Sequence, residues 1–257
     1  LPADAAADLT SGNWLFGRGA LDMKSGVAVH MTVIKALSEN CGNLEGNVLF
    51  MANPVEENQH TGMIEALPVL DELSKREQLQ YVAAINNDYV APLYEGDPNR
   101  YFYLGAIGKL LACFYVVGKE THAGQCFEGL DPTLLSAELV RLIDLNVDFC
   151  DSFAGTLTPP PTVLKATDLK PSYNVQTPLA SFLYFNFFVN HASVEQIIGK
   201  LRRTAEQAVV NVMAYLNGQY RSYCEKTQAV YRPLPFAPRV LTFEELYKEV
   251  AAYTPDL

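Results

Sequence analysis

Four acidic residues stand where a carboxylate could hold a metal ion or move a proton. Asp22 closes a glycine-rich turn, Glu56 and Glu57 follow one apolar run, and Asp88 follows another. A carboxylate at the end of such a turn can reach two cations with its two oxygens. Glu56 and Glu57 are neighbours whose side chains diverge, which favours two separate roles. The chemistry open to this set is metal binding combined with proton transfer.

Each of these residues also has a purely structural explanation. Asp22 could cap a helix, because aspartate accepts hydrogen bonds from free backbone N–H groups there. Glu56 and Glu57 could be a solvated pair opening a helix, where negative charge suits the dipole. Asp88 could belong to a plain turn. The residues alone leave both explanations open.

The first third of the chain alternates between helical and continuous apolar patterns. In order, we expect a helix, a strand, a helix and a strand over Gly26–Leu37, Asn47–Ala52, Gly62–Leu73 and Tyr81–Ile85. This order predicts a parallel sheet, in which ligands bind beyond the carboxyl ends of the strands. Glu56, Glu57 and Asp88 would lie at that edge.

After Gly105 the pattern changes to a mixed α+β arrangement. The apolar patterns predict strand, helix, strand, strand, helix and strand over Lys109–Val117, Pro132–Leu145, Val163–Thr167, Ser181–Asn190, Ser193–Tyr223 and Thr227–Tyr231. This βαββαβ order is ferredoxin-like. We therefore expect a first domain over 1–106, an inserted domain over 107–232, and a return to the first domain over 233–257 through a helix at Leu241–Ala251.

Three motifs occur in one order: GRGALDMKSG at Gly17–Gly26, PVEEN at Pro54–Asn58 and GKETHAG at Gly118–Gly124. Together they resemble the zinc-dependent aminoacylase, dipeptidase and glutamate carboxypeptidase family over nearly the whole chain. The last two motifs resemble most its arginine-utilisation, RocB-type branch. The resemblance implies a partial parallel-sheet zinc-exopeptidase catalytic domain in an α/β fold, with an inserted ferredoxin-like α+β lid and dimerisation domain.

The resemblance also implies a role for each candidate residue. Asp22 would bridge two zinc ions, Glu57 would bind one of them, and Asp88 would be the next acidic ligand. Glu56 would be the general base that takes a proton from water and passes it to the leaving amine. In a homodimer, His122 would reach the neighbouring subunit's active site and stabilise the oxyanion.

The other polar candidates are weaker. His122 could instead be satisfied within its own loop. Asn174 and Arg203 are minor candidates for contacts with a substrate carboxylate, and we predict no catalytic role for three further histidines, His30, His60 and His191.

The chain departs from the family pattern in its histidines. Relatives supply one zinc ligand from a His-x-Asp motif upstream of the glycine-rich turn and another histidine near the end of the catalytic domain. This chain has no His-x-Asp motif and no histidine after His191. Three carboxylates alone should hold two zinc ions poorly. We therefore expect an internal piece that is itself inactive, from a protein that binds two zinc ions, with cobalt or manganese as alternatives.

Composition limits the remaining classes. A formal net charge of -10 disfavours a nucleic-acid partner. No apolar run approaches the roughly 20 residues that span a bilayer, and a basic signal-peptide start is absent, so we predict a cytoplasmic protein without membrane contact. The five cysteines form no CxxC pair, and we expect reduced, mostly buried thiols.

The predicted reaction is hydrolysis of an amide bond in a peptide-like or N-acyl amino acid substrate, by water activated between two zinc ions. The alternative is a non-catalytic binding or dimerisation protein that lost its metal ligands. A nucleotide-binding loop at Gly17–Gly26 is excluded, because the motif lacks GxxxxGK[ST] spacing and Asp22 would repel phosphate.

Overall fold

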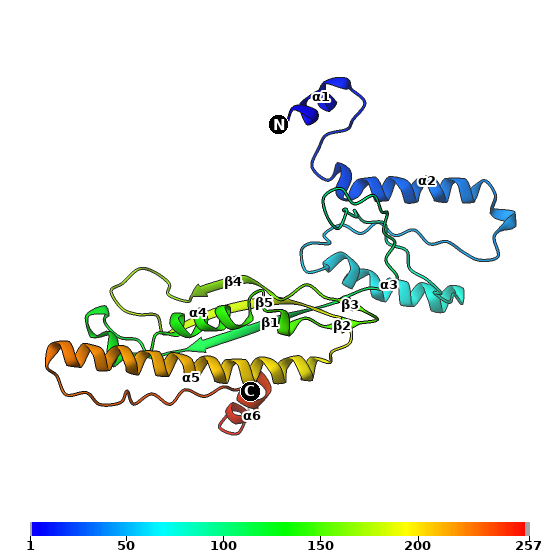
Figure 1. Ribbon diagram of the computed structural model, residues 1–257. Coiled ribbons are helices and arrows are strands. Elements are labelled where there is room, and N and C mark those ends of the chain that lie inside the picture. Colours follow the sequence, from blue (N-terminus) through cyan, green and yellow to red (C-terminus); the bar gives the residue numbers. More distant parts are fainter. Residues whose placement is uncertain (1, 255–257) are drawn as a thin grey trace. The chain divides into compact units, whose positions relative to one another are not determined.

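The chain divides after Tyr103 into two units, here called the N-terminal and the C-terminal unit. The structure is a computed structural model that describes residues 2–254 (Figure 1). None of the helices in that range is long and apolar enough to span a bilayer.

The N-terminal unit is built from helices joined by long irregular segments. Its helices are α1, Ala3–Ser11, α2, Gly26–Ser38, and α3, Thr61–Glu77. An irregular turn over Ala20–Ser25 leads directly into α2, and a short 3-10 helix, Cys41–Asn43, follows it. The predicted helices at Gly26–Leu37 and Gly62–Leu73 are thus confirmed as α2 and α3.

The strands predicted for this unit are wrong for the described residues. Asn47–Ala52 and Tyr81–Ile85 are irregular, and no parallel sheet is present in the part of the chain that the structure describes. A strand is stable where it finds a ladder partner and buries a face. Neither condition holds here, since Val48 is 56% and Val82 88% exposed.

The C-terminal unit contains a three-stranded antiparallel sheet in the order β1–β5–β4 (Figure 1). Its strands are β1, Gly108–Val117, β4, Thr162–Asp168, and β5, Ala180–Val189. Phe114 stands opposite Leu183, and β4 joins the other edge of β5 with one irregularity between Val163 and Lys165. A two-strand hairpin precedes β4 and consists of β2, Ser152–Phe153, and β3, Thr156–Leu157.

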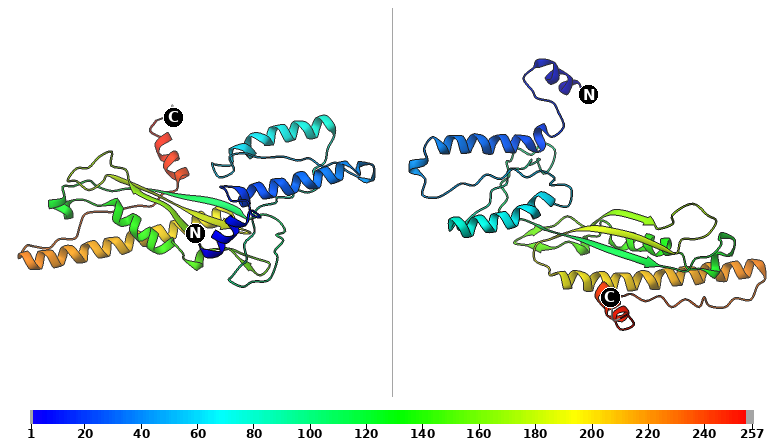
Figure 2. Two further views of the ribbon diagram at one scale, coloured as in Figure 1. Left: turned by 90° about the horizontal axis from the view of Figure 1, so that it is seen from above. Right: turned by 180° about the vertical axis from the view of Figure 1, so that it is seen from behind.

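Two helices cover one face of this sheet (Figure 2). They are α4, Pro132–Ile143, and α5, Val194–Thr227. The strand period of two sends alternate side chains inward. The central core consists of Ala112, Leu139, Ile143, Leu183, Phe185, Phe187, Leu201, Ala205 and Ala208. The predicted strands at Lys109–Val117, Val163–Thr167 and Ser181–Asn190 and the helices at Pro132–Leu145 and Ser193–Tyr223 are confirmed.

The final strand predicted at Thr227–Tyr231 is wrong. α5 continues to Thr227, and the following segment runs back beside this helix as an irregular strap (Figure 1). Asn217 of α5 holds the strap, because its Oδ1 accepts from the Tyr231 hydroxyl and from the Leu234 backbone N–H. The strap is rich in proline, which cannot donate to a ladder.

The strap ends in helix α6, Phe243–Ala251, which confirms the helix predicted at Leu241–Ala251. Thr242 and Glu245 form a capping box at its start. Glu245 also accepts a hydrogen bond of 2.6 Å from Arg202 of α5. The segment is therefore attached to α5 in this structure, while its assignment to a catalytic domain stays a prediction.

All five cysteines are free, as expected from their spacing. The expectation that they are mostly buried is wrong: Cys224 is buried and Cys150 is partly buried, but Cys41, Cys113 and Cys126 are exposed. Cys113 illustrates the reason, because it lies on β1 between Ala112 and Phe114, which face the core, and so points to the opposite face.

Candidate functional site

Asp22 lies inside the irregular turn that precedes α2. Gly19 begins this turn with a left-handed φ of 72°, and the Lys24 N–H donates to the Gly19 carbonyl at 3.0 Å. The peptide bond between Asp22 and Met23 is cis. Asp22 does not cap α2, since the capping position is Ser25. Its side chain is exposed, which leaves the carboxylate accessible to a cation.

A close backbone contact joins the Asp22 segment to the Asp88 segment. Gly26 is buried, and a Cβ at this position would lie 1.9 Å from the carbonyl oxygen of Asn87. Real Cβ atoms do not approach oxygen so closely, so only glycine fits here. The contact sets the turn bearing Asp22 beside the segment that ends in Asp88. Gly26 belongs to the GRGALDMKSG motif, but the motif alone does not reveal this contact.

A second glycine holds the loop that carries Glu56 and Glu57. A Cβ on Gly62, in the first turn of α3, would lie 1.9 Å from Asn53 Oδ1 and 2.4 Å from the Pro54 carbonyl oxygen. The loop thus returns onto its own start. Asn53 Oδ1 is buried without a hydrogen-bond partner. The sequence signal for this contact is the glycine five residues after Glu57.

The backbone of this loop is unusual. Val55, Gln59 and His60 have positive φ values of 65°, 61° and 54°. Such a conformation is rare for residues other than glycine and strained for a β-branched one, and strain of this kind is concentrated at functional sites. The close contact at Gly62 closes the strained loop.

Glu56 and Glu57 do not open a helix, because α3 begins at Thr61 and has no acidic residue in its first turn. Glu56 Oε1 lies 3.6 Å from His60 Nδ1, and both side chains are more than half exposed. A contact so exposed contributes little to stability. Glu56 is therefore open to solvent and Glu57 is likewise exposed, while the proton-accepting role of Glu56 stays a prediction.

The predicted metal ligands do not form a metal centre in this structure. Among residues 2–254, no group of three or more histidine, cysteine or acidic side chains is close enough to hold an ion. Asp22, Glu57 and Asp88 supply oxygen alone, a donor set that suits Mg²⁺ or Mn²⁺ better than Zn²⁺. These three residues by themselves do not fit a zinc ion, and their roles stay predictions.

His122 lies in the C-terminal unit, in a loop closed by tight contacts. Lys119 pairs with Leu130 across its base. A Cβ on Gly118 would lie 2.0 Å from the Leu130 carbonyl oxygen, and one on Gly129 would lie 2.4 Å from Thr121 Cγ2. Both glycines therefore let the two ends of the loop meet.

The His122 ring is exposed, but its orientation is defined. Its Nδ1 accepts a hydrogen bond of 3.0 Å from the Gly124 backbone N–H. In the neutral ring, an accepting Nδ1 leaves the proton on Nε2. The Nε2–H then remains available as a donor, which is the form that stabilisation of an oxyanion requires.

The loop is backed by residues 174–177, which come from the connection between β4 and β5. His122 pairs with Gln176, Ala123 donates to the Val175 carbonyl at 2.9 Å, and Thr177 donates to the Thr121 carbonyl at 2.8 Å. The minor candidate Asn174 lies at the start of this segment. The fold thus brings Asn174 near His122, although 51 residues separate them in sequence.

A family comparison accounts for the order of the motifs. The sequence model of peptidase family M20/M25/M40 matches residues 2–217, most of the chain and all five predicted site residues. The chain belongs to this family. The recognition made from the GRGALDMKSG, PVEEN and GKETHAG motifs is therefore confirmed.

Individual relatives of this M20-family chain give the same result. It is 40% identical over 247 residues to Protein RocB of Bacillus subtilis strain 168, and 39% identical over 251 residues to the uncharacterized protein YqjN of the same organism. Each alignment covers 96% of this chain and 44% of the relative. The chain therefore spans less than half the length of these relatives. A succinyl-diaminopimelate desuccinylase of Sulfurimonas denitrificans is 26% identical over 183 residues, 70% of this chain and 46% of that protein.

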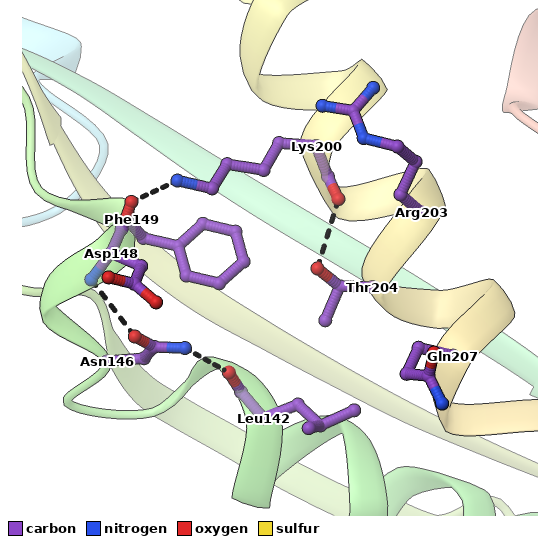
Figure 3. A pocket seen from close by; sticks show the side chains of 8 residues that line it. All are labelled: Leu142, Asn146, Asp148, Phe149, Lys200, Arg203, Thr204 and Gln207. Carbon is purple, nitrogen blue, oxygen red and sulfur yellow. Dashed lines mark hydrogen bonds between the residues drawn. The ribbon is translucent and has the colours of Figure 1, made fainter. Parts of the chain in front are cut away.

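A pocket of about 320 Å³ lies elsewhere in the C-terminal unit of the M20-family chain (Figure 3). It is lined by Leu142, Asn146, Asp148, Phe149, Lys200, Arg203, Thr204 and Gln207. Lys200 is already engaged, because it donates to the Asp148 carbonyl and lies 4.6 Å above the Phe149 ring. Arg203 is the one sequence candidate in this pocket.

The pocket is remote from His122. Phe127, which closely follows His122, packs against Tyr220 with 4.9 Å between ring centroids and an interplanar angle of 37°. From Gln207 to Tyr220, α5 advances about 20 Å. The structure therefore separates Arg203 from the His122 loop, whereas it brings Asn174 close to that loop.

Proposed function

We propose that this M20-family protein hydrolyses an amide bond in a peptide-like or N-acyl amino acid substrate, with water activated between two zinc ions. The observation that carries the proposal is the family's three motifs in order, two of them held by the contacts of Gly26 and Gly62. A relative named succinyl-diaminopimelate desuccinylase supports an N-acyl amino acid as the substrate class.

Asp22 would bridge the two ions, and Glu57 and Asp88 would each hold one. Zinc supplies Lewis acidity that polarises the scissile carbonyl and lowers the pKa of a bound water. Because these oxygens do not suffice for zinc, nitrogen donors must come from elsewhere in the complete protein. The aligned relatives are more than twice as long as this chain, which leaves room for such donors.

Two further side chains would act on the reacting atoms. Glu56 would accept a proton from the attacking water and return it to the leaving amine, and its exposed carboxylate suits this exchange. His122 would donate from Nε2 to the oxyanion of the tetrahedral intermediate. The contact with the Gly124 N–H supports this role, since it fixes the required tautomer.

His122 would act on the active site of the partner in a homodimer formed through the C-terminal unit, which would be the inserted lid and dimerisation domain. Mixed dimers of the complete protein test this arrangement. Glu56→Gln subunits and His122→Ala subunits, each inactive alone, should together recover activity, because one composite site regains both groups. No recovery in dimers shown to be mixed would rule out action across the interface.

Zinc titration by calorimetry tests the ligand assignment. The 257-residue chain should bind zinc weakly and with little preference over Mg²⁺, and Asp22→Asn should weaken even this binding. Asp8→Asn is the matched control. Tight binding of two zinc equivalents, together with amide hydrolysis by this chain, would show that the ligand set is wrong.

The non-catalytic alternative is not favoured, because the family comprises peptidases and includes the named desuccinylase. A cytoplasmic location and a place in arginine utilisation stay predictions of the sequence.

A further inference from the structure

Lys170 lies at the start of the eleven-residue connection between β4 and β5, residues 169–179. Its side chain is partly buried and folds across this connection. The ammonium group donates to two backbone carbonyls, that of Asn174 at 3.1 Å and that of Gln176 at 2.7 Å. Hydrogen bonds from a charged donor are stronger than neutral ones. Lys170 therefore fixes the far side of the connection.

The Val175 carbonyl lies between those of Asn174 and Gln176 in the chain and is directed to the opposite side of the segment. Val175 accepts from Ala123, in the loop that carries His122, and not from Lys170. Alternation of carbonyl direction is the property of an extended segment. Residues 174–177 thus form a short extended segment with one edge on the His122 loop and the other edge on the Lys170 ammonium.

The His122 loop depends on this segment for its backbone contacts. The Ala123 N–H donates from the loop to the segment, and the Thr177 N–H donates from the segment to the loop. The Thr177 hydroxyl also accepts from the Thr121 N–H at 3.0 Å. His122 itself is exposed and is held through its neighbours. A change that loosens residues 174–177 is therefore transmitted to His122 through the pairing.

We propose that Lys170 is a positioning residue for His122. Its ammonium group clamps residues 174–177 from behind, and this segment holds the His122 loop in the geometry that presents Nε2. The expected effect on turnover rests on the proposed function, whereas the holding of the His122 loop rests on the hydrogen bonds given above. Near-attack geometry is sensitive to displacements of about 1 Å, so loss of the clamp should lower turnover more than substrate binding.

Amide hydrogen exchange at Ala123 and Thr177 measures the clamp directly. In Lys170→Met, exchange at both amides should become about ten-fold faster, because loss of the two charge-assisted bonds favours local opening. Lys170→Arg retains charged donors and should restore slow exchange. Lys165→Met is the matched control: this lysine lies on β4, is exposed, and should leave both amides unchanged. Unchanged exchange in Lys170→Met would overturn the inference.

Turnover in the complete protein separates this inference from the proposed function. Lys170→Met should lower kcat about ten-fold and leave KM within about two-fold, with recovery in Lys170→Arg. If His122→Ala abolishes turnover while Lys170→Met leaves it unchanged, Lys170 does not position His122 and the inference is wrong. If His122→Ala itself keeps full turnover, the proposed role of His122 fails, whatever the exchange data give for Lys170. If the wild-type complete protein hydrolyses no amide substrate, the proposed function fails, and the exchange data still decide whether Lys170 holds the loop.

Discussion

The predicted functional residues of the two units are held in place by different kinds of structure. In the C-terminal unit, the His122 loop is attached to a sheet whose inner face and two covering helices form a continuous apolar core. In the described part of the N-terminal unit, the buried residues are Gly26 and Asp97. Its carboxylates are arranged by close backbone contacts at glycine, without a core beneath them.

The difference shows that an apolar run becomes a strand only when it has a partner. Lys109–Val117 and Asn47–Ala52 have similar patterns, but the first pairs with β5 along its whole length and the second has no ladder partner in the described chain. The exposed Val48 and Val82 are the consequence. Four experiments can break or sharpen this comparison.

The largest effect is expected on turnover when Glu56, the proposed general base in the N-terminal unit, is replaced. In the complete protein, Glu56→Gln keeps the size of the side chain but removes its basicity, so kcat should fall by about 10² to 10⁴. Zinc content, measured by plasma mass spectrometry, should stay the same. Glu57→Gln should instead lose zinc. Loss of zinc in Glu56→Gln would mean that the roles of the two glutamates are exchanged.

The next effect contrasts one apolar side chain from each unit. Phe185 is fully buried in the core, so Phe185→Ala should destabilise the C-terminal unit by about 3 to 5 kcal/mol. Val82 is 88% exposed, so Val82→Ala should change the free energy of unfolding by less than about 0.5 kcal/mol. Urea unfolding followed by circular dichroism measures both. A cost of several kcal/mol at Val82 would show that a packed sheet does form around it.

These contrasts also show what the sequence could reveal. The helix and strand patterns of the C-terminal unit were sufficient to predict β1, β4, β5, α4 and α5, because each apolar face meets another within the same unit. The strand at Thr227–Tyr231 was mispredicted, because its pattern did not reveal that Asn217 would anchor the segment to α5.

The candidate site was predictable only in part. The motifs identified the family, and the family model covers Asp22, Glu56, Glu57, Asp88 and His122. The supports of these residues were not predictable from spacing. Gly62 and Lys170 act through contacts with Asn53 and with the Gln176 carbonyl, and such contacts depend on how loops fold back in space.

A smaller effect is expected from the glycine that holds the Glu56–Glu57 loop. Gly62→Ala would place a methyl group 1.9 Å from Asn53 Oδ1, and overpacking of this kind costs about 1 to 3 kcal/mol. Exchange of the Met63 and Ile64 amides, in the first turn of α3, should become correspondingly faster. Gly46→Ala is the matched control, because nothing lies within 4 Å of its Cβ position. Equal exchange in both variants would mean that the loop is not held by this contact.

The smallest effect is expected on stability at low pH, through the carboxylate of Asp151 in the C-terminal unit. Asp151 Oδ2 accepts from the backbone N–H groups of Ala192, His191 and Asn190 at 2.8, 2.6 and 2.8 Å. These bonds, those from Ala192 and His191 foremost, lower the pKa of Asp151 to about 2. They tie the hairpin that precedes β4 to the turn before α5.

The sign of the pH effect follows from this depressed pKa. Asp151 is ionised in the unfolded chain above its ordinary pKa of 3.8, so its stabilising contribution is fully present above that pH. As the pH falls toward 2, the unfolded chain binds the proton first, and about 1 kcal/mol of stability should be lost after allowance for solvent screening. Urea unfolding of the wild type at pH 7, 4, 3 and 2 should show this loss, and Asp151→Asn, with no charge to lose, should show a shallower decline over the same range. Equal slopes for the two proteins would assign the acid sensitivity to other carboxylates.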